Sequence, residues 1–170
     1  VYCSAMLRAL QTAQPVGAAL GIAPEVWVDI HEHGGIFEED GSGGRRGAPG
    51  LTRAEITAQF PDYVLPDAVT ERGWYTGDYE THAACQGRAI SVARQLREWV
   101  ATGADRVVII THGTFLDSLL KALLNELPGS GHFYYHYNTG ITRIDLLADG
   151  RLALHYLNRT AHLTDEQLSA

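Results

Sequence analysis

The 170-residue sequence predicts an α/β protein, a three-layer α/β/α sandwich with a mostly parallel sheet and a C-terminal hairpin. Helix-like and strand-like segments alternate along the chain, which is typical of a sheet covered by helices. The run Val107 to Ile110 is apolar throughout, as expected of a strand covered on both faces. Asp149-Gly150 lies between two strand-like segments and indicates a hairpin turn. We find no internal repeat and expect a single domain over residues 1–170.

The first part of the chain predicts a strand, a helix and a second strand. Residues 1–3 read as the end of a strand, and the segment after them has helical spacing. Ser4 is the expected N-cap of this helix and Gly21 its expected end. Pro15 is expected to bend the helix or to delay its start. Residues 26–28, Val-Trp-Val, predict a short strand.

A glycine-rich stretch and two helices follow. We expect Glu38 to Gly50 to be a loop and the most flexible part of the chain. Thr52 and Glu55 form the capping-box pattern Thr-x-x-Glu, which predicts a short helix that ends near Phe60-Pro61. After a further loop, residues 79–100 carry apolar side chains that can share one helical face.

The last part of the chain predicts a strand, a helix and the hairpin. Arg106 to Thr111 is the strand that contains the apolar run. Phe115 to Leu124 predicts a helix with leucines on its buried face. Gly140 to Leu147 and Leu152 to Leu157 are expected to pair as the two strands of the hairpin.

Composition argues against several classes of function. The net charge is −7, whereas a nucleic-acid-binding surface needs basic side chains that neutralise phosphates. No apolar run approaches the roughly 20 residues of a membrane helix, and no secretion signal is visible. Cys3 and Cys85 show no repeated spacing and indicate reduced thiols. We therefore expect a cytoplasmic protein without a nucleic-acid or membrane partner.

A histidine and an arginine follow predicted strands, where open α/β sheets carry their functional groups. His112 directly follows the apolar strand and precedes a helix, whose first N–H groups and positive dipole end favour an oxyanion. Arg8 lies on the first turn of the helix after residues 1–3, where a guanidinium can bind phosphate oxygens. Two plainer interpretations remain open: His112 as a core histidine bonded to backbone, and Arg8 as a solvated surface residue.

A further titratable group, His31-Glu32-His33, precedes the glycine-rich stretch. A metal site is one interpretation. Alternate residues of an extended segment point to opposite sides, however, so joint ligation by His31 and His33 is awkward. The spacing also differs from the His-Glu-x-x-His of metal-binding helices. For Glu32, a loop carboxylate in water is the plainer interpretation.

Five segments together resemble one known family, the histidine phosphatase (phosphoglycerate mutase-like) superfamily. "VYCSAMLRALQTA" is similar to its strand followed by Ser-x-x-x-Arg-Ala-x-x-Thr-Ala. "VVIITHGTF" resembles its second histidine motif, and "DIHEHGGIF" resembles the segment that carries its acid. "YNTGITRI" and "YLNRTAHL" resemble its closing hairpin and its C-terminal Asn-x-x-x-His-Leu. The segments span the chain in the family's order, so the resemblance implies a phosphoglycerate mutase-like fold.

The resemblance implies a phosphomonoester hydrolase that works through a phosphohistidine intermediate. In that chemistry Arg8 and His112 bind the phosphoryl oxygens, the backbone of Gly113 and Thr114 adds donors, and Glu32 acts as acid and base. The implied substrate is a small phosphorylated metabolite. No metal or other cofactor is implied, because arginine and histidine supply the positive charge. The alternatives are a phosphoglycerate mutase-type phosphotransferase and a non-catalytic domain that binds a phosphorylated ligand.

Four other polar residues keep two interpretations each. Asn138 either stabilises a turn or orients His112. Arg45, Arg46 and Arg53 either bind a distal anionic group of the substrate or are solvated. The acidic balance and the glycine-rich stretch suggest an open site, and so favour a phosphatase over a mutase.

The Arg-His-Gly signature of the family's first strand, which carries the nucleophilic histidine, does not occur in this sequence. We therefore expect a truncated domain that lacks its first strand and helix, with the nucleophile upstream of Val1. The absent strand is expected in the middle of the sheet, next to the strands that end at Cys3 and Thr111. By itself the chain is expected to be inactive. Its oligomeric state is left open, with a dimer as one option.

Overall fold

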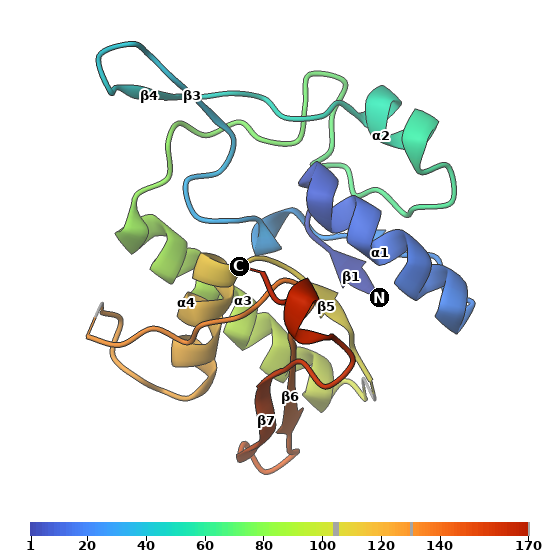
Figure 1. The fold of residues 1–170 in the computed structure, drawn as a ribbon, viewed down its shortest axis with the longest axis vertical. Coiled ribbons are helices and arrows are strands. Elements are labelled where there is room, and N and C mark those ends of the chain that lie inside the picture. Colours follow the sequence, from blue (N-terminus) through green and yellow to red (C-terminus); the bar gives the residue numbers. More distant parts are fainter. Residues whose placement is uncertain (104–105, 130, 170) are drawn as a thin grey trace.

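The computed structural model describes residues 1–103, 106–129 and 131–169 (Figure 1). No helix in these ranges is long and apolar enough to cross a membrane. The elements in chain order are β1 (Tyr2–Cys3), α1 (Leu7–Leu20), β2 (Glu25–Val26), the 3-10 helix η1 (Val28–Ile30), β3 (Phe37–Glu39), β4 (Arg45–Gly47), α2 (Arg53–Gln59), α3 (His82–Ala101), β5 (Ile109–Ile110), α4 (Gly113–Leu123), β6 (Ile141–Leu146), β7 (Leu152–Arg159) and the 3-10 helix η2 (Asp165–Gln167).

Short parallel strands form the central sheet, in the order β2-β1-β5. Cys3 of β1 pairs with Val26 on one side and with Ile110 on the other. β6 and β7 form a separate antiparallel hairpin, as do β3 and β4. The predicted parallel sheet and C-terminal hairpin are both present.

Each face of the central sheet is covered by its own helices. Successive strand residues point to opposite faces. Cys3 and Ile110 pack into the core that includes side chains of α1 and α2. Tyr2 and Ile109 pack into the core that includes side chains of α3 and α4. Figure 1 shows α1 and α2 on one side of β1 and β5, with α3 and α4 on the other. The prediction of a three-layer α/β/α fold is confirmed.

Helix α1 ends as predicted but starts later. Gly21 ends it in the left-handed region, at φ 65°, where glycine avoids the clash of a Cβ atom. The N-cap is Met6 and not Ser4; Ser4 is buried, and its Oγ accepts from the Met6 N–H at 3.3 Å. The Ser4 hydroxyl therefore stabilises the turn between β1 and α1. Pro15 lies inside the helix, which continues beyond it.

The glycine-rich stretch is not the loop that the sequence predicts. It contains the β3–β4 hairpin, at the upper left of Figure 1. The carboxylate of Asp40 holds the turn by accepting from the N–H groups of Ser42 and Gly44, at 2.9 and 2.8 Å. A Cβ atom on Gly47 would clash with the Gly77 carbonyl. Glycine is therefore needed there for a close backbone contact.

The two helices in the middle of the chain begin at capping residues. Thr52 and Glu55 form the predicted capping box, in which each side chain accepts from the backbone N–H of the other residue. Thr81 caps α3 by accepting from the Ala84 N–H at 3.3 Å. Helix α3 consequently begins at His82, and not at residue 79 as the periodicity predicts.

The apolar strand differs most from its prediction. β5 is confined to two residues, and the preceding Val107 and Val108 are 39% and 40% exposed, although the sequence predicts burial on both faces. Within the described ranges β5 has one neighbouring strand, β1, and its other edge is unpaired. The exposure follows, because no described element covers the strand on its second edge.

The edges of the described strands show where a further strand could pair. β1 is paired on both edges, so a further strand cannot lie beside Cys3. Among the described strands, every strand except β1 has one open edge, β5 and β6 included. Ile109, Ile144 and Leu146 nevertheless pack against one core cluster. β5 and the hairpin therefore contribute to the same core, and β1 has no edge left for a further strand among the described residues.

Candidate active site

Arg8 and His112 meet at the edge where β1 and β5 end. β1 leads through a short turn into α1, which carries Arg8, and β5 leads into His112, the N-cap of α4. Because these strands are parallel neighbours, their carboxyl ends lie side by side. Arg8 Nε donates to His112 Nδ1 at 3.0 Å. The structure thus brings together the two residues that the sequence placed at strand ends.

His112 is a neutral hydrogen-bond donor. A guanidinium can only donate, so Nδ1 accepts from Arg8 and the ring proton is on Nε2. The side chain is buried, with His112 7% exposed, and burial together with the charge of Arg8 lowers its pKa to about 3. Nε2 has no hydrogen-bond partner among the described residues. A buried N–H group is therefore available for an incoming ligand.

Glu32 lies against the first turn of α4. Its Oε1 accepts from the N–H groups of Phe115 and His33, at 2.9 and 2.8 Å, and its Oε2 accepts from the Thr114 N–H at 3.2 Å. The free N–H groups and the positive end of the helix stabilise a carboxylate there. The Thr114 N–H, which the resemblance assigns to phosphate, is thus occupied by Glu32. Gly113 is the first residue of α4.

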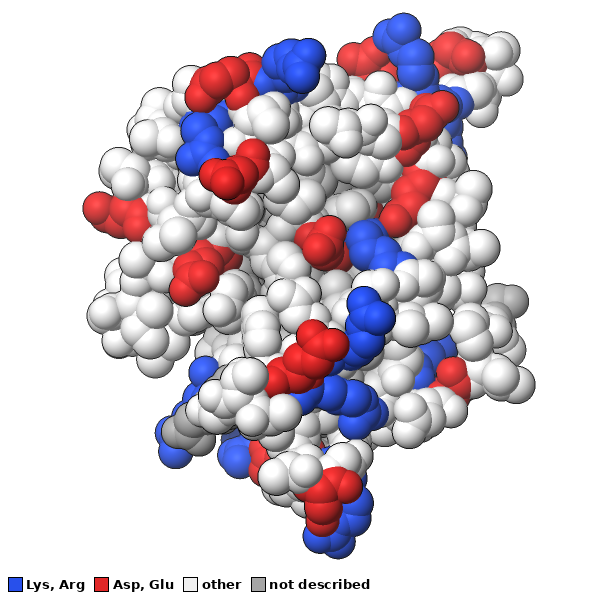
Figure 2. Space-filling model, turned by 180° about the vertical axis from the view of Figure 1, so that it is seen from behind, with Lys and Arg blue, Asp and Glu red and all other residues white. Residues whose placement is uncertain are grey.

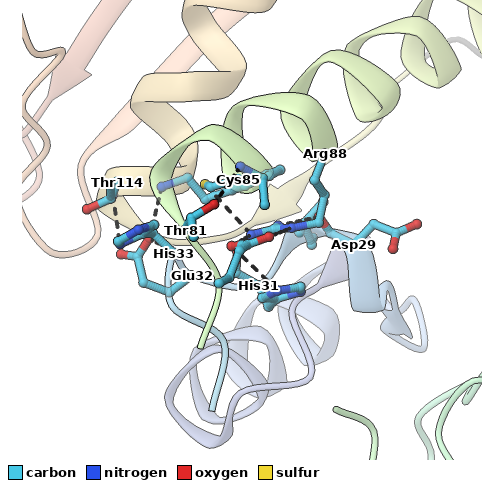
Figure 3. A network of polar contacts seen from close by, with 12 residues as sticks. Asp29, His31, Glu32, His33, Thr81, Cys85, Arg88 and Thr114 are labelled. Carbon is cyan, nitrogen blue, oxygen red and sulfur yellow. Dashed lines mark hydrogen bonds and ion pairs between the residues drawn. The ribbon is translucent and has the colours of Figure 1, made fainter. Parts of the chain in front are cut away.

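A buried ion pair that the sequence analysis missed holds the loop after η1 (Figure 3). Arg88 of α3 donates to both carboxylate oxygens of Glu80, at 2.8 and 2.6 Å. Its Nη1 donates to the carbonyls of Asp29 and His31, at 2.7 and 2.9 Å. The guanidinium also lies 4.4 Å from the centroid of the Phe115 ring. One side chain therefore joins α3, α4 and the loop, and nothing in the spacing of α3 distinguishes it from a surface arginine.

The two histidines beside Glu32 have different surroundings. His31 Nδ1 lies 2.7 Å from the Val28 carbonyl, and its ring packs near Trp74. His33 packs against the ring of Tyr79. Their divergence agrees with the argument from alternate residues. In the described ranges, no three His, Cys, Asp or Glu side chains form a group that could hold a metal ion.

Both cysteines are buried free thiols. Burial raises the pKa of Cys3 to about 12 and that of Cys85 to about 11. Neither is therefore a thiolate near neutral pH, the form in which cysteine is a nucleophile.

Asn138 and Arg53 have structural partners. The backbone N–H of Asn138 donates to the Ser169 carbonyl at 2.7 Å, and its side-chain amide donates to Ser169 Oγ at 3.2 Å. Arg53 donates to the carbonyls of Leu65, Pro66 and Val69. The contacts of Asn138 fit its interpretation as a residue that stabilises a turn. The guanidinium of Arg53 is used in hydrogen bonds to backbone carbonyls.

An arginine beside a neutral histidine donor, at the carboxyl edge of a parallel sheet, suits an anionic ligand. The chain belongs to the histidine phosphatase superfamily (branch 1), whose family model matches residues 1–160. This superfamily comprises phosphatases and mutases that bind small phosphorylated substrates, which supports an enzyme of phosphatase or phosphotransferase type.

A solved structure is similar in fold. YhfR of Bacillus stearothermophilus is 21% identical in sequence, and the match has a TM-score of 0.57 and covers 95% of this chain and 74% of that chain. Curated protein sequences give no significant match.

Proposed function

We propose that this chain provides the phosphate-binding part of a phosphomonoester hydrolase that works through a phosphohistidine intermediate. The observation that carries the proposal is the contact between Arg8 Nε and His112 Nδ1 at 3.0 Å, which turns the buried N–H of His112 into an unpaired donor beside a guanidinium. A small phosphorylated metabolite is the proposed substrate.

Arg8 and His112 offer a phosphoryl group two kinds of donor. The Nε of Arg8 is committed to His112, and its terminal N–H groups bring positive charge to a ligand. His112 adds a neutral N–H that persists at every pH above its lowered pKa. Preorganised donors of this kind stabilise the charge on the phosphoryl oxygens in the transition state.

In the proposed reaction, Glu32 exchanges a proton with the ester oxygen. Its bonds to α4 hold the carboxylate next to the phosphate-binding pair. To reach a substrate, one carboxylate oxygen has to give up a backbone N–H, and the 3.2 Å bond from Thr114 is the longest of the three. Its release would free the Thr114 N–H for the phosphate, which reconciles the two roles.

We place the nucleophilic histidine on a strand outside these 170 residues, because Arg-His-Gly does not occur in the sequence. His112 is unsuited to the attack, since its Nδ1 accepts from Arg8 and its Nε2 carries the proton. The open edges of β5 and β6 support a strand between them, as does the exposure of Val107 and Val108.

The surroundings favour hydrolysis over transfer to a second hydroxyl. A mutase has to retain a phosphorylated intermediate in a closed, basic pocket. Here Arg45 pairs with Glu39 at 2.9 Å, and Arg46 pairs with Glu38 at 3.6 Å. Basic and acidic side chains are also interspersed over the face drawn in Figure 2. These exposed pairings place a negative charge beside each hairpin arginine, which weakens the attraction of the hairpin for a second anionic group.

The test is a trapping experiment on this chain extended upstream by a strand with Arg-His-Gly. Rapid quenching with a radiolabelled phosphomonoester should give acid-labile, alkali-stable phosphate on the histidine of that strand. Replacing this histidine by alanine should abolish the label while the protein stays folded. Turnover by the 170-residue chain alone would contradict the proposal.

A further inference from the structure

Aromatic rings gather directly after Glu32. His33 is the next residue, and its backbone N–H donates to Glu32 Oε1 at 2.8 Å. The His33 ring meets the rings of Tyr79 and His82 edge to face, with centroids 5.8 and 5.4 Å away. Figure 3 shows Glu32 and His33 next to Thr114, at the start of α4. A group of rings therefore adjoins the carboxylate of the proposed acid.

Tyr79 is held in place from several sides. The Phe37 ring of β3 meets it edge to face at 5.0 Å. The guanidinium of Arg45 lies 4.8 Å from the centroid of the Tyr79 ring, and its Nη1 donates to the Tyr79 hydroxyl at 2.7 Å. A Cβ atom on Gly34 would lie 3.1 Å from both the Phe37 and the Tyr79 ring, so glycine permits this close packing. We call the four rings the aromatic cluster: His33, Phe37, Tyr79 and His82.

The aromatic cluster is partly open to solvent and carries no net charge of its own near neutral pH. Its rings are half-buried, apart from the exposed His82. Burial and the charge of His82 lower the pKa of His33, which keeps the His33 ring neutral at pH 7. Arg45, which contacts Tyr79, is paired with Glu39 at 2.9 Å. Such a surface favours an uncharged aromatic group over a second anion.

The leaving group of a phosphomonoester has to lie close to this cluster. In the proposed function Arg8 and His112 hold the phosphoryl group, and Glu32 protonates the ester oxygen. The carbon skeleton of the leaving alcohol begins at that oxygen, and so within a bond or two of the acid. His33 directly follows Glu32, which places the aromatic cluster within reach of an alcohol that contains one or two rings.

We propose that the aromatic cluster is the leaving-group subsite of this chain and that it selects phosphate esters of aromatic alcohols. The inference rests on the proposed function and names the substrate class of the same site. The phosphorus–oxygen bond breaks, a phosphorus–nitrogen bond forms at the upstream histidine, and the alcohol leaves with the proton from Glu32. Each edge-to-face contact with the cluster should favour an aromatic alcohol by about two- to tenfold.

The decisive variant is His33→Ser in the extended chain with the nucleophilic histidine. Serine removes the ring and keeps the backbone N–H that bonds Glu32. The second-order rate constant for phosphoenzyme formation should fall by about tenfold with naphthyl phosphate and by less than about twofold with ethyl phosphate. Hydrolysis of the phosphoenzyme should not change, because the leaving group has already departed. Rapid-quench kinetics with both esters measure the two steps.

The same kinetics separate this role from an indirect effect on the acid. If His33→Ser acted by displacing Glu32, ethyl phosphate would be slowed the most, because a poor leaving group depends most on acid catalysis. That order would overturn the inference, as would equal slowing of both esters or no change in either.

A control and a second variant complete the test. His155→Ser, at an exposed histidine paired with Asp145, should act like the wild type. His82→Ser removes the exposed ring of the aromatic cluster and serves where His33→Ser does not fold, as judged by thermal unfolding; it should also slow naphthyl phosphate more than ethyl phosphate. Absence of phosphoenzyme from every ester in the wild type would instead overturn the proposed function, and this inference with it.

Discussion

The location of one proton decides what Arg8 and His112 can bind. Arg8 occupies Nδ1 of His112, so the ring offers a donor at Nε2. Burial keeps the ring neutral, so the positive charge of the pair belongs to Arg8 alone. Such a pair suits an ionised phosphoryl oxygen and does not suit a cation. Substitutions at each residue therefore have distinct expected effects.

Arg8→Ala in the extended chain should lower kcat/KM for phosphomonoesters by about ten- to a hundredfold, the equivalent of one lost charge-assisted hydrogen bond. Arg8→Lys should recover little, because an ammonium lacks the planar fork that bonds His112 and phosphate together. Steady-state kinetics measure this. Arg151→Ala, at an exposed residue paired with Asp149, is the control and should act like the wild type. Full activity in Arg8→Lys would indicate a role limited to net charge.

His112 should make the fold sensitive to acid. Its pKa is about 3 in the folded chain and about 6.5 when unfolded, so the unfolded state binds more protons between these values. Stability from this group is complete above pH 6.5 and is lost as the pH falls toward 3, by an amount on the order of a few kcal/mol. Urea unfolding at pH 7, 5 and 4 measures the slope. In His112→Asn the loss between pH 7 and 4 should be smaller; an unchanged slope would contradict the buried neutral ring.

Among the elements, α3 does more than cover the sheet. Arg88 projects from its first turns, is held by the Glu80 carboxylate, and binds the two carbonyls that precede Glu32. The α4 N–H groups hold Glu32 from the other side. The candidate acid therefore takes its position from two helices, although it lies on a loop.

Arg88→Met should destabilise the fold by about 3–5 kcal/mol, because it leaves the Glu80 carboxylate buried without its partner. Adding Glu80→Gln should restore part of this loss by removing the uncompensated charge. Equilibrium denaturation gives the free energy of unfolding. Arg94→Met, on the same helix in an exposed pair with Glu98, should change stability by less than about 1 kcal/mol. A similar effect at both arginines would argue against a structural role for the buried pair.

The open edge of β5 gives a prediction that depends on the chain used. Val108→Thr should change the stability of the 170-residue chain by less than about 0.5 kcal/mol, because Val108 is 40% exposed. In the extended chain the same substitution should cost about 1–2 kcal/mol, because a strand beside β5 would bury that side chain. Unfolding curves of both chains provide the comparison. Equal effects would mean that the added strand does not cover β5.

For the whole molecule, the order of the elements and the layers could be predicted from the sequence more accurately than the burial of individual side chains. Helix ends at Gly21 and Thr52 followed from local chemistry, which needs no distant partner. The exposure of Val107 could not be predicted, since an apolar run does not reveal whether a second neighbour is present. The contact between Arg8 and His112 could be predicted from their positions after two strands, because the carboxyl ends of neighbouring parallel strands lie side by side.

Other features of the site depend on contacts that no local pattern encodes. The buried ion pair between Arg88 and Glu80 is one example, because arginine and glutamate are also common on solvent-exposed helices. The bonds of Glu32 to the N-terminus of α4 join segments 82 and 83 residues apart. Their geometry follows only from the packing of α3 and α4 around the loop, which the sequence does not specify residue by residue.

If the proposed nucleophilic strand pairs with the open edges of β5 and β6, the domain should divide into two parts that reassemble. A synthetic peptide with a β-strand sequence around Arg-His-Gly should add to these edges by backbone hydrogen bonds. The chain alone would then be inactive, and binding of the peptide would convert it into an enzyme. Turnover should rise and saturate as peptide is titrated in. A peptide in which alanine replaces the histidine should bind at the same edges but support no turnover. It should therefore inhibit by competing with the active peptide, so that peptide binding can be measured separately from catalysis.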